Sequence, residues 1–211
     1  MLKGYRMDAR LHKKALFLSY FTVGYNIVEG IVSVFAGLIA GSIALTGFGL
    51  DSFVESLSGS VMIWRLRKHS LITEEEEERV EKRALKLIAW SFFILGAYVF
   101  YEAVRKLYFR EIPEPSLLGI IIAAVSLIIM PILYLQKYRT GKAIGSRSLV
   151  ADSKETLACV LLSVSLLIGL GMNYIWGVWW ADPVAGFVIV YFLVKEGREA
   201  LEEKESEEEI V

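Results

Sequence analysis

The sequence has 211 residues, of which 55% are hydrophobic, and soluble globular domains usually contain about 45–50%. This excess argues against a soluble enzyme, and also against a disordered chain, which is poor in apolar residues. Lys and Arg number 23 and Asp and Glu 24, giving a formal net charge of −1, so we expect no nucleic-acid partner.

Six apolar segments follow one another along the chain. Each has about 20–26 residues, which as a helix measures about 30–39 Å and is long enough to cross a bilayer. Helices are expected because a lone segment in lipid has to satisfy its own main-chain hydrogen bonds. The predicted spans are 13–38, 42–66, 84–108, 116–137, 147–171 and 180–200.

Turn-forming residues separate these spans. Glycines and prolines are typical of such breaks, and Asp-Pro is typical of a helix start. The residues that mark the breaks are Gly37 and Gly41, Pro113 and Pro115, Gly141 and Gly145, Gly177, and Asp182 with Pro183.

The distribution of Lys and Arg predicts the orientation, because cytoplasmic loops carry the excess of these residues. Basic residues are concentrated before the first span, in the expected loops 65–83 and 136–147, and after the last span, whereas 37–42 and 169–182 contain none. Loop 105–114 departs from this pattern. We therefore expect an all-α polytopic protein of the cell membrane with both termini in the cytoplasm. Residues 1–200 should form one six-helix transport domain, and residues 201–211 a short acidic tail with no separate C-terminal domain.

Acidic residues inside the second span are the first candidates for function. A charged side chain at the centre of a bilayer costs about 2.5–3.5 kcal/mol on insertion scales, so such residues are functional candidates by default. Asp51 and Glu55 are four residues apart and therefore share one helix face. Two carboxylates this close repel each other in a low-dielectric site unless a cation lies between them. A polar contact between helices is the structural alternative.

The fifth span contains a second stripe of polar residues. Asp152, Glu155 and Cys159 lie at i, i+3 and i+7, which places them on one face. Asp152 is near the cytoplasmic end, so it could be interfacial or lie at the mouth of a site. Cys159 could equally be a small buried apolar residue. Glu155 lies deeper in the span than Asp152, so a purely structural role explains it less well.

Two helices with paired ligands can together form a four-ligand metal site. The predicted ligands are Asp51, Glu55, Glu155 and Cys159. Carboxylates and a thiolate bind divalent transition metals, and zinc favours four ligands. Because ligands must lose protons to bind a metal, departure of the metal allows protons to replace it, which is a physical basis for metal–proton exchange. Asn26 and Glu29 in the first span are expected either to line the same pathway, together with Asp152, or to have a structural role.

Several of these segments resemble the cation diffusion facilitator family of divalent-metal transporters. The resemblance covers about residues 10–200 and includes Asn26 and Glu29. Its motifs are GSIALTGFGLDSFVES (41–56), YEAVRKL (101–107), SLVADSKETLACVLLS (148–163) and ADPVAGFVIVYFLVKEG (181–197). Each motif alone is weakly specific, whereas six spans that carry them in this order are fairly specific.

The resemblance implies a transport site made by ligand pairs on spans two and five, at Asp51 with Glu55 and Glu155 with Cys159. It further implies export of cytoplasmic metal by proton antiport, alternating access and a homodimer in the bilayer. The sequence differs from the family in having Cys159 where Asp is usual and in having no His in either pair. Zinc is the expected cargo, with manganese, iron or cobalt as alternatives.

Two other functions fit the same features. A passive divalent-cation channel also needs carboxylates inside the membrane, and a membrane metal sensor or scaffold would bind metal without moving it. No His-based metal motif or serine nucleophile motif occurs within the spans, so we expect no enzyme. Metal and protons are expected as transported species and not as cofactors.

Overall fold

The computed structural model describes residues 9–68, 74–112, 114 and 116–208, which form six α-helices joined by turns, with no strand in these ranges. The all-α prediction is confirmed. The helices are α1 (Ala9–Ala40), α2 (Ile43–Lys68), α3 (Glu74–Phe109), α4 (Leu117–Ile144), α5 (Arg147–Trp176) and α6 (Ala181–Glu208).

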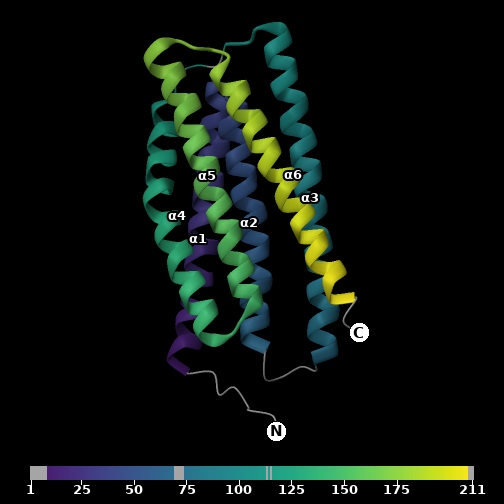
Figure 1. Ribbon diagram of the computed structural model, residues 1–211. Helices are drawn as coiled ribbons and strands as arrows, with labels where there is room; N and C mark the ends of the chain where they lie inside the picture. The colour runs from purple at the N-terminus through teal and green to yellow at the C-terminus, as the bar shows by residue number, and fades with distance from the viewer. Residues whose placement is uncertain (1–8, 69–73, 113, 115, 209–211) are drawn as a thin grey trace.

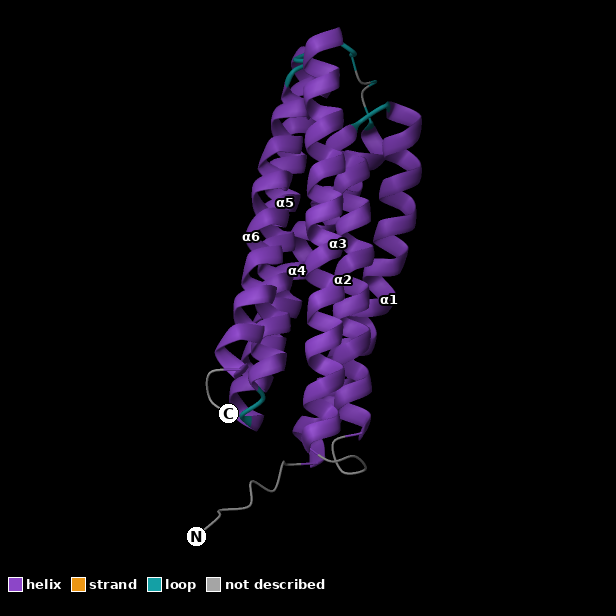
Figure 2. Cartoon of the chain, turned by 90° about the vertical axis from the view of Figure 1, so that its right-hand side faces the viewer, coloured by secondary structure: helices purple, strands orange, loops and turns teal. Residues whose placement is uncertain are grey.

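The helices form an elongated bundle in which successive helices run in opposite directions, and α1 begins at the end of the bundle where α6 finishes (Figures 1 and 2). Three neighbouring pairs pack most extensively, α1 with α2, α4 with α5 and α3 with α6. Helices α2 and α5 contact each other, and both also contact α6. The carboxylates predicted on α2 and α5 are therefore on neighbouring helices.

Helices α3, α4 and α6 are longer than the sequence predicted. The acidic run 74–78 belongs to the first turns of α3, so most of the expected 65–83 loop is helical and only 69–73 lies outside the described residues. The expected 136–147 loop is likewise mostly the last turns of α4. In both cases the polar flank of a span continues the helix beyond the apolar segment.

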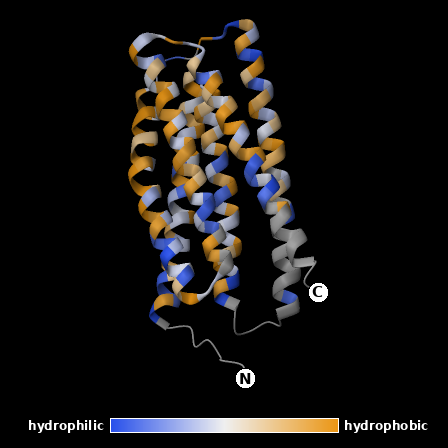
Figure 3. Ribbon diagram, in the orientation of Figure 1, coloured by the Kyte–Doolittle hydropathy of each residue, from blue (hydrophilic) through white to orange (hydrophobic). Residues whose placement is uncertain are grey.

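The outer surface of the bundle is apolar. In Figure 3 hydrophobic residues dominate most of the bundle, and hydrophilic residues gather toward the end at which α1 begins. Large side chains such as Ile94, Ile128 and Ile132 are exposed, whereas serines and threonines are buried between the helices. This distribution suits lipid outside and small polar contacts between helices.

Three helices within the described part of the chain are long and apolar enough to cross a membrane, over Arg10–Ala40, Leu117–Ile144 and Asp152–Trp176. The prediction named six spans. Helices α2, α3 and α6 carry Asp and Glu together with Lys and Arg, and these charges lower their hydropathy.

Two glycines bring α1 and α2 close together beside the acidic residues. A Cβ atom on Gly30 would lie 2.9 Å from the main-chain oxygen of Gly49, and one on Gly49 would lie 2.8 Å from the main-chain nitrogen of Val34. No side chain fits at either distance without a shift of the backbone. This contact fixes the position of α1 relative to the part of α2 that carries Asp51 and Glu55.

Candidate metal site

A small pocket brings together acidic side chains from α2, α5 and α6. The cavity volume is about 10 Å³, close to the minimum that admits one water-sized particle. Its acidic lining residues are Asp51 and Glu55 of α2, Glu155 of α5 and Glu196 of α6. Its apolar walls are Phe92, Ala158, Leu162, Phe192 and Leu193. Three of the four predicted ligands thus line one pocket.

The two carboxylates of α2 are buried, with 7% of Asp51 and 3% of Glu55 exposed. Glu155 and Glu196 are partly exposed and complete the acidic lining. Oε2 of Glu55 and Oε2 of Glu155 are buried and accept no hydrogen bond from the described residues. A buried carboxylate oxygen without a donor is costly, so the pocket offers two oxygens that a cation could satisfy.

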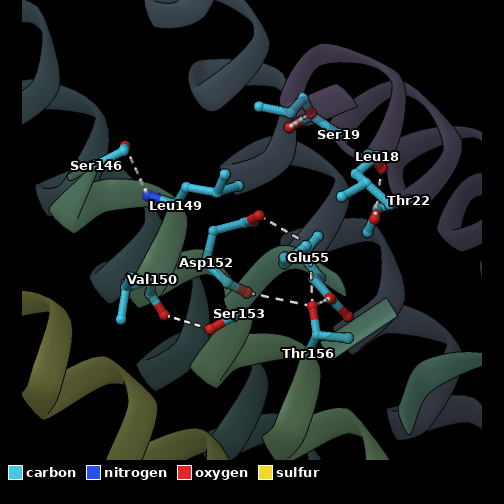
Figure 4. A network of polar contacts seen from close by, with 12 residues as sticks. Leu18, Ser19, Thr22, Glu55, Ser146, Leu149, Val150, Asp152, Ser153 and Thr156 are labelled. Atoms are coloured by element: carbon cyan, nitrogen blue, oxygen red, sulfur yellow. Dashed lines mark hydrogen bonds and ion pairs between the residues drawn. The ribbon is translucent and has the colours of Figure 1, made fainter. Parts of the chain in front are cut away.

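Glu55 is held from one side by a polar network between α2, α4 and α5. The Thr156 hydroxyl donates to Oε1 of Glu55 at 2.9 Å, and Lys137 Nζ donates to the Thr156 oxygen at 2.9 Å. Figure 4 shows Thr156 directed toward Glu55, with Asp152 beside them. The Lys137 ammonium also forms an ion pair with Oδ2 of Asp152 at 2.8 Å.

This network corrects one interpretation of the sequence. Lys137 was counted among the basic residues of the expected 136–147 loop, but it lies in α4 and is 0% exposed. Asp152 was expected at the interface or at the mouth of a site, and it is 4% exposed and paired with Lys137. A buried ion pair is stable only when its geometry and its remaining hydrogen bonds are good, and Thr156 supplies one of those bonds.

Cys159 lies in the main apolar cluster of the bundle and is 1% exposed. It does not belong to the residues that line the pocket. Among the described residues, no three side chains of His, Cys, Asp or Glu form a group that could hold a metal ion in this conformation. The carboxylates surround the pocket without converging on one point, so the four-ligand set stays a prediction.

Asn26 and Glu29 of α1 are buried against α2 and lie close to Glu55. Glu29 accepts hydrogen bonds from the Tyr25 hydroxyl at 2.9 Å and from the Ser52 hydroxyl at 3.0 Å. The Asn26 side chain is 0% exposed and forms no hydrogen bond within the described ranges. Neither residue lines the pocket, and their place on a transport pathway stays a prediction.

Over residues 19–206 the chain matches the family described as the cation efflux transmembrane domain. The chain belongs to the cation efflux family. This confirms the resemblance noted in the sequence and identifies the chain as a multi-pass membrane protein of a transporter family.

Three relatives illustrate the range of the family. The chain is 23% identical to Transmembrane protein 163 of Xenopus laevis over 88% of this chain and 65% of the relative. It is 27% identical to an uncharacterised transporter of Methanocaldococcus jannaschii over 87% of this chain and 65% of the relative. It is 22% identical to the manganese efflux system protein MneS of Bacillus subtilis over 82% of this chain and 61% of the relative. The chain thus spans less than two thirds of the length of these relatives.

Two residues in or beside the pocket, Lys137 and Glu196, were not singled out from the sequence. Glu196 is flanked by Lys195 and Arg198, so it resembled any other charge at the polar end of a span. Thr156 extends the polar stripe of span five, but the sequence alone does not show that its hydroxyl contacts Glu55. The depth of Lys137 depends on how α4 packs against α5, which its own segment does not encode.

Proposed function

We propose that the chain exports divalent transition-metal cations from the cytoplasm and binds them in the pocket between α2, α5 and α6. The observation that supports this most is the meeting of Asp51, Glu55 and Glu155 in one pocket with apolar walls. Carboxylates are rare within membrane domains unless they have a partner or a function. Membership of the cation efflux family agrees with that function.

Asp51, Glu55 and Glu155 are the proposed primary ligands. Two residues are candidates for a fourth position: Cys159, which is near Glu55 but outside the pocket lining, and Glu196, which lines the pocket. The choice bears on the cargo, because thiolate suits zinc whereas oxygen ligands suit manganese. Zinc is the expected cargo if Cys159 binds, and manganese, which a relative is named for exporting, if carboxylates alone bind.

The transport cycle that we propose is proton antiport with alternating access. The proposed topology has six membrane crossings and both termini in the cytoplasm. It agrees with the bundle, in which successive helices alternate in direction and α1 begins at the end where α6 finishes (Figure 1). Protons replace the metal on the carboxylates when the metal leaves, since the ligands bind metal only in the deprotonated form. Rocking of α1, α2, α4 and α5, in a homodimer, is the proposed motion.

Metal flux into proteoliposomes that contain the purified protein tests this function. Zinc, manganese, cobalt and iron are offered with and without an imposed pH gradient, and Asp51→Asn is measured beside wild type. Glu102→Gln is the matched control, because Glu102 pairs with Arg105 at 3.0 Å and does not line the pocket.

We expect gradient-dependent flux of at least one metal in wild type and Glu102→Gln, and a loss of about 100-fold or more in Asp51→Asn, because a buried pair of ligands is broken. Flux that ignores the pH gradient would indicate the passive channel. Folded protein that binds metal without moving it would indicate the sensor or scaffold.

A further inference from the structure

The two carboxylate oxygens of Glu55 have different surroundings. Oε1 accepts a hydrogen bond from the Thr156 hydroxyl at 2.9 Å. Oε2 is buried and has no hydrogen-bond partner in the described part of the chain, while Glu55 itself lines the pocket. One oxygen is therefore occupied by the protein, and the other is available to a ligand.

Lys137 fixes the direction of this hydrogen bond. An ammonium group can only donate, so in its 2.9 Å contact with Lys137 Nζ the Thr156 oxygen is the acceptor. A threonine hydroxyl has a single proton. Two acceptors lie within reach of that proton, and Oε1 of Glu55 at 2.9 Å is nearer than the main-chain oxygen of Asp152 at 3.2 Å.

The chain from Lys137 through Thr156 to Glu55 is well protected from water. Lys137 and Thr156 are both 0% exposed, and Glu55 is 3% exposed. The second contact of the ammonium, with Oδ2 of Asp152 at 2.8 Å, holds it in place. Hydrogen bonds that involve a charged group are about twice as strong as neutral ones, and a polar chain without water reinforces each of its bonds.

We propose that Lys137 and Thr156 are positioning residues that restrict Glu55 to binding a metal through one oxygen, and that this restriction selects small transition-metal cations over calcium. Calcium takes six to eight oxygens and often both oxygens of one carboxylate, whereas zinc is satisfied by four single ligands. This inference rests on the proposed function, because it requires Glu55 to be a metal ligand.

The test compares Thr156→Val with Thr156→Ser in the purified full-length protein. Valine keeps the branched shape and removes the hydroxyl, whereas serine keeps the hydroxyl. Dissociation constants for calcium and for manganese or zinc are measured by titration calorimetry, and their ratio is the readout. A purely structural role for Thr156 would weaken both metals together and leave the ratio unchanged.

We expect wild type and Thr156→Ser to share one ratio, and the preference over calcium to fall about tenfold in Thr156→Val, the change that one hydrogen bond to a charged group supports. An unchanged ratio in folded Thr156→Val would overturn the inference and leave the proposed function intact. Wild-type protein that binds no divalent cation would overturn both.

A second measurement does not depend on whether Thr156→Val folds. The infrared difference spectrum upon metal binding is recorded for wild type and for Glu55→Gln at metal concentrations that saturate both, so that the bands missing from the variant are those of the Glu55 carboxylate. The gap between its two stretching bands is wider when one oxygen binds the metal than when both do. A wide gap supports the restriction, and a narrow gap contradicts it.

Discussion

At the scale of single residues, the pocket holds carboxylates in two kinds of environment. Asp51 and Glu55 are buried within the bundle, whereas Glu155 and Glu196 are partly exposed. Glu55 alone is fixed by a hydrogen bond that leads to a buried cation. A metal that enters the pocket therefore meets Glu55 in a fixed orientation, whereas the partly exposed side chains of Glu155 and Glu196 can change theirs.

The fourth ligand is decided by comparing Cys159→Ser with Glu196→Gln. If the thiolate turns into the pocket, Cys159→Ser shifts the preference from zinc toward manganese, because the hydroxyl that replaces it is a harder ligand. If Glu196 is the fourth ligand, Glu196→Gln raises KM for every metal by about tenfold, the loss expected for one interaction with a charged group. Flux assays with both metals distinguish the two. A Cys159→Ser variant with the wild-type preference would remove the thiolate from the set.

At the scale of helices, the ends and crossings of α2 determine where the pocket lies. At its first residues, Asp182 of α6 accepts hydrogen bonds from the Ser42 hydroxyl and from the Ile43 main-chain N–H, the latter at 3.0 Å. Lys106 of α3 donates to the main-chain oxygen of Gly41 at the same turn. These bonds connect α2, α3 and α6 at the end of the bundle opposite the start of α1.

The glycine crossing of α1 and α2 gives a prediction with an internal control. In Gly30→Ala the new Cβ would lie 2.9 Å from the Gly49 oxygen, whereas in Gly24→Ala nothing lies within 4 Å. We expect Gly30→Ala to lower the free energy of unfolding by about 1–3 kcal/mol, as overpacking does. Gly24→Ala should be neutral or stabilising, by up to about 1 kcal/mol, through helix propensity. Denaturation in detergent micelles measures both, and equal effects would contradict the close contact.

At the scale of the whole molecule, the sequence predicted the features that depend on local pattern. The helices follow from apolar segments as long as a bilayer is thick, and Asp51 lies one turn from Glu55 because four residues make about one turn. The shared pocket of these residues with Glu155 also agrees with the prediction.

The features that the sequence did not predict depend on how helices far apart in the chain pack together. Lys137 has Tyr138 and Arg139 as neighbours and resembles a cytoplasmic basic cluster, yet the packing of α4 on α5 buries it against Asp152. Glu196 joins the pocket only because α6 contacts α2 and α5. Cys159 shares a helix face with Glu155, but it lies a turn further along α5, where it is packed among apolar residues beside Glu55 and does not line the pocket.

The central claim is that the pocket between α2, α5 and α6 is where the transported metal binds. The most direct measurement is anomalous diffraction from crystals of the full-length protein soaked with zinc or manganese, recorded at the absorption edge of the metal. The account predicts one strong peak within bonding distance of Asp51, Glu55 and Glu155, and its loss in Asp51→Asn. A metal bound elsewhere in the bundle with this pocket empty, or a peak that persists in Asp51→Asn, would contradict it.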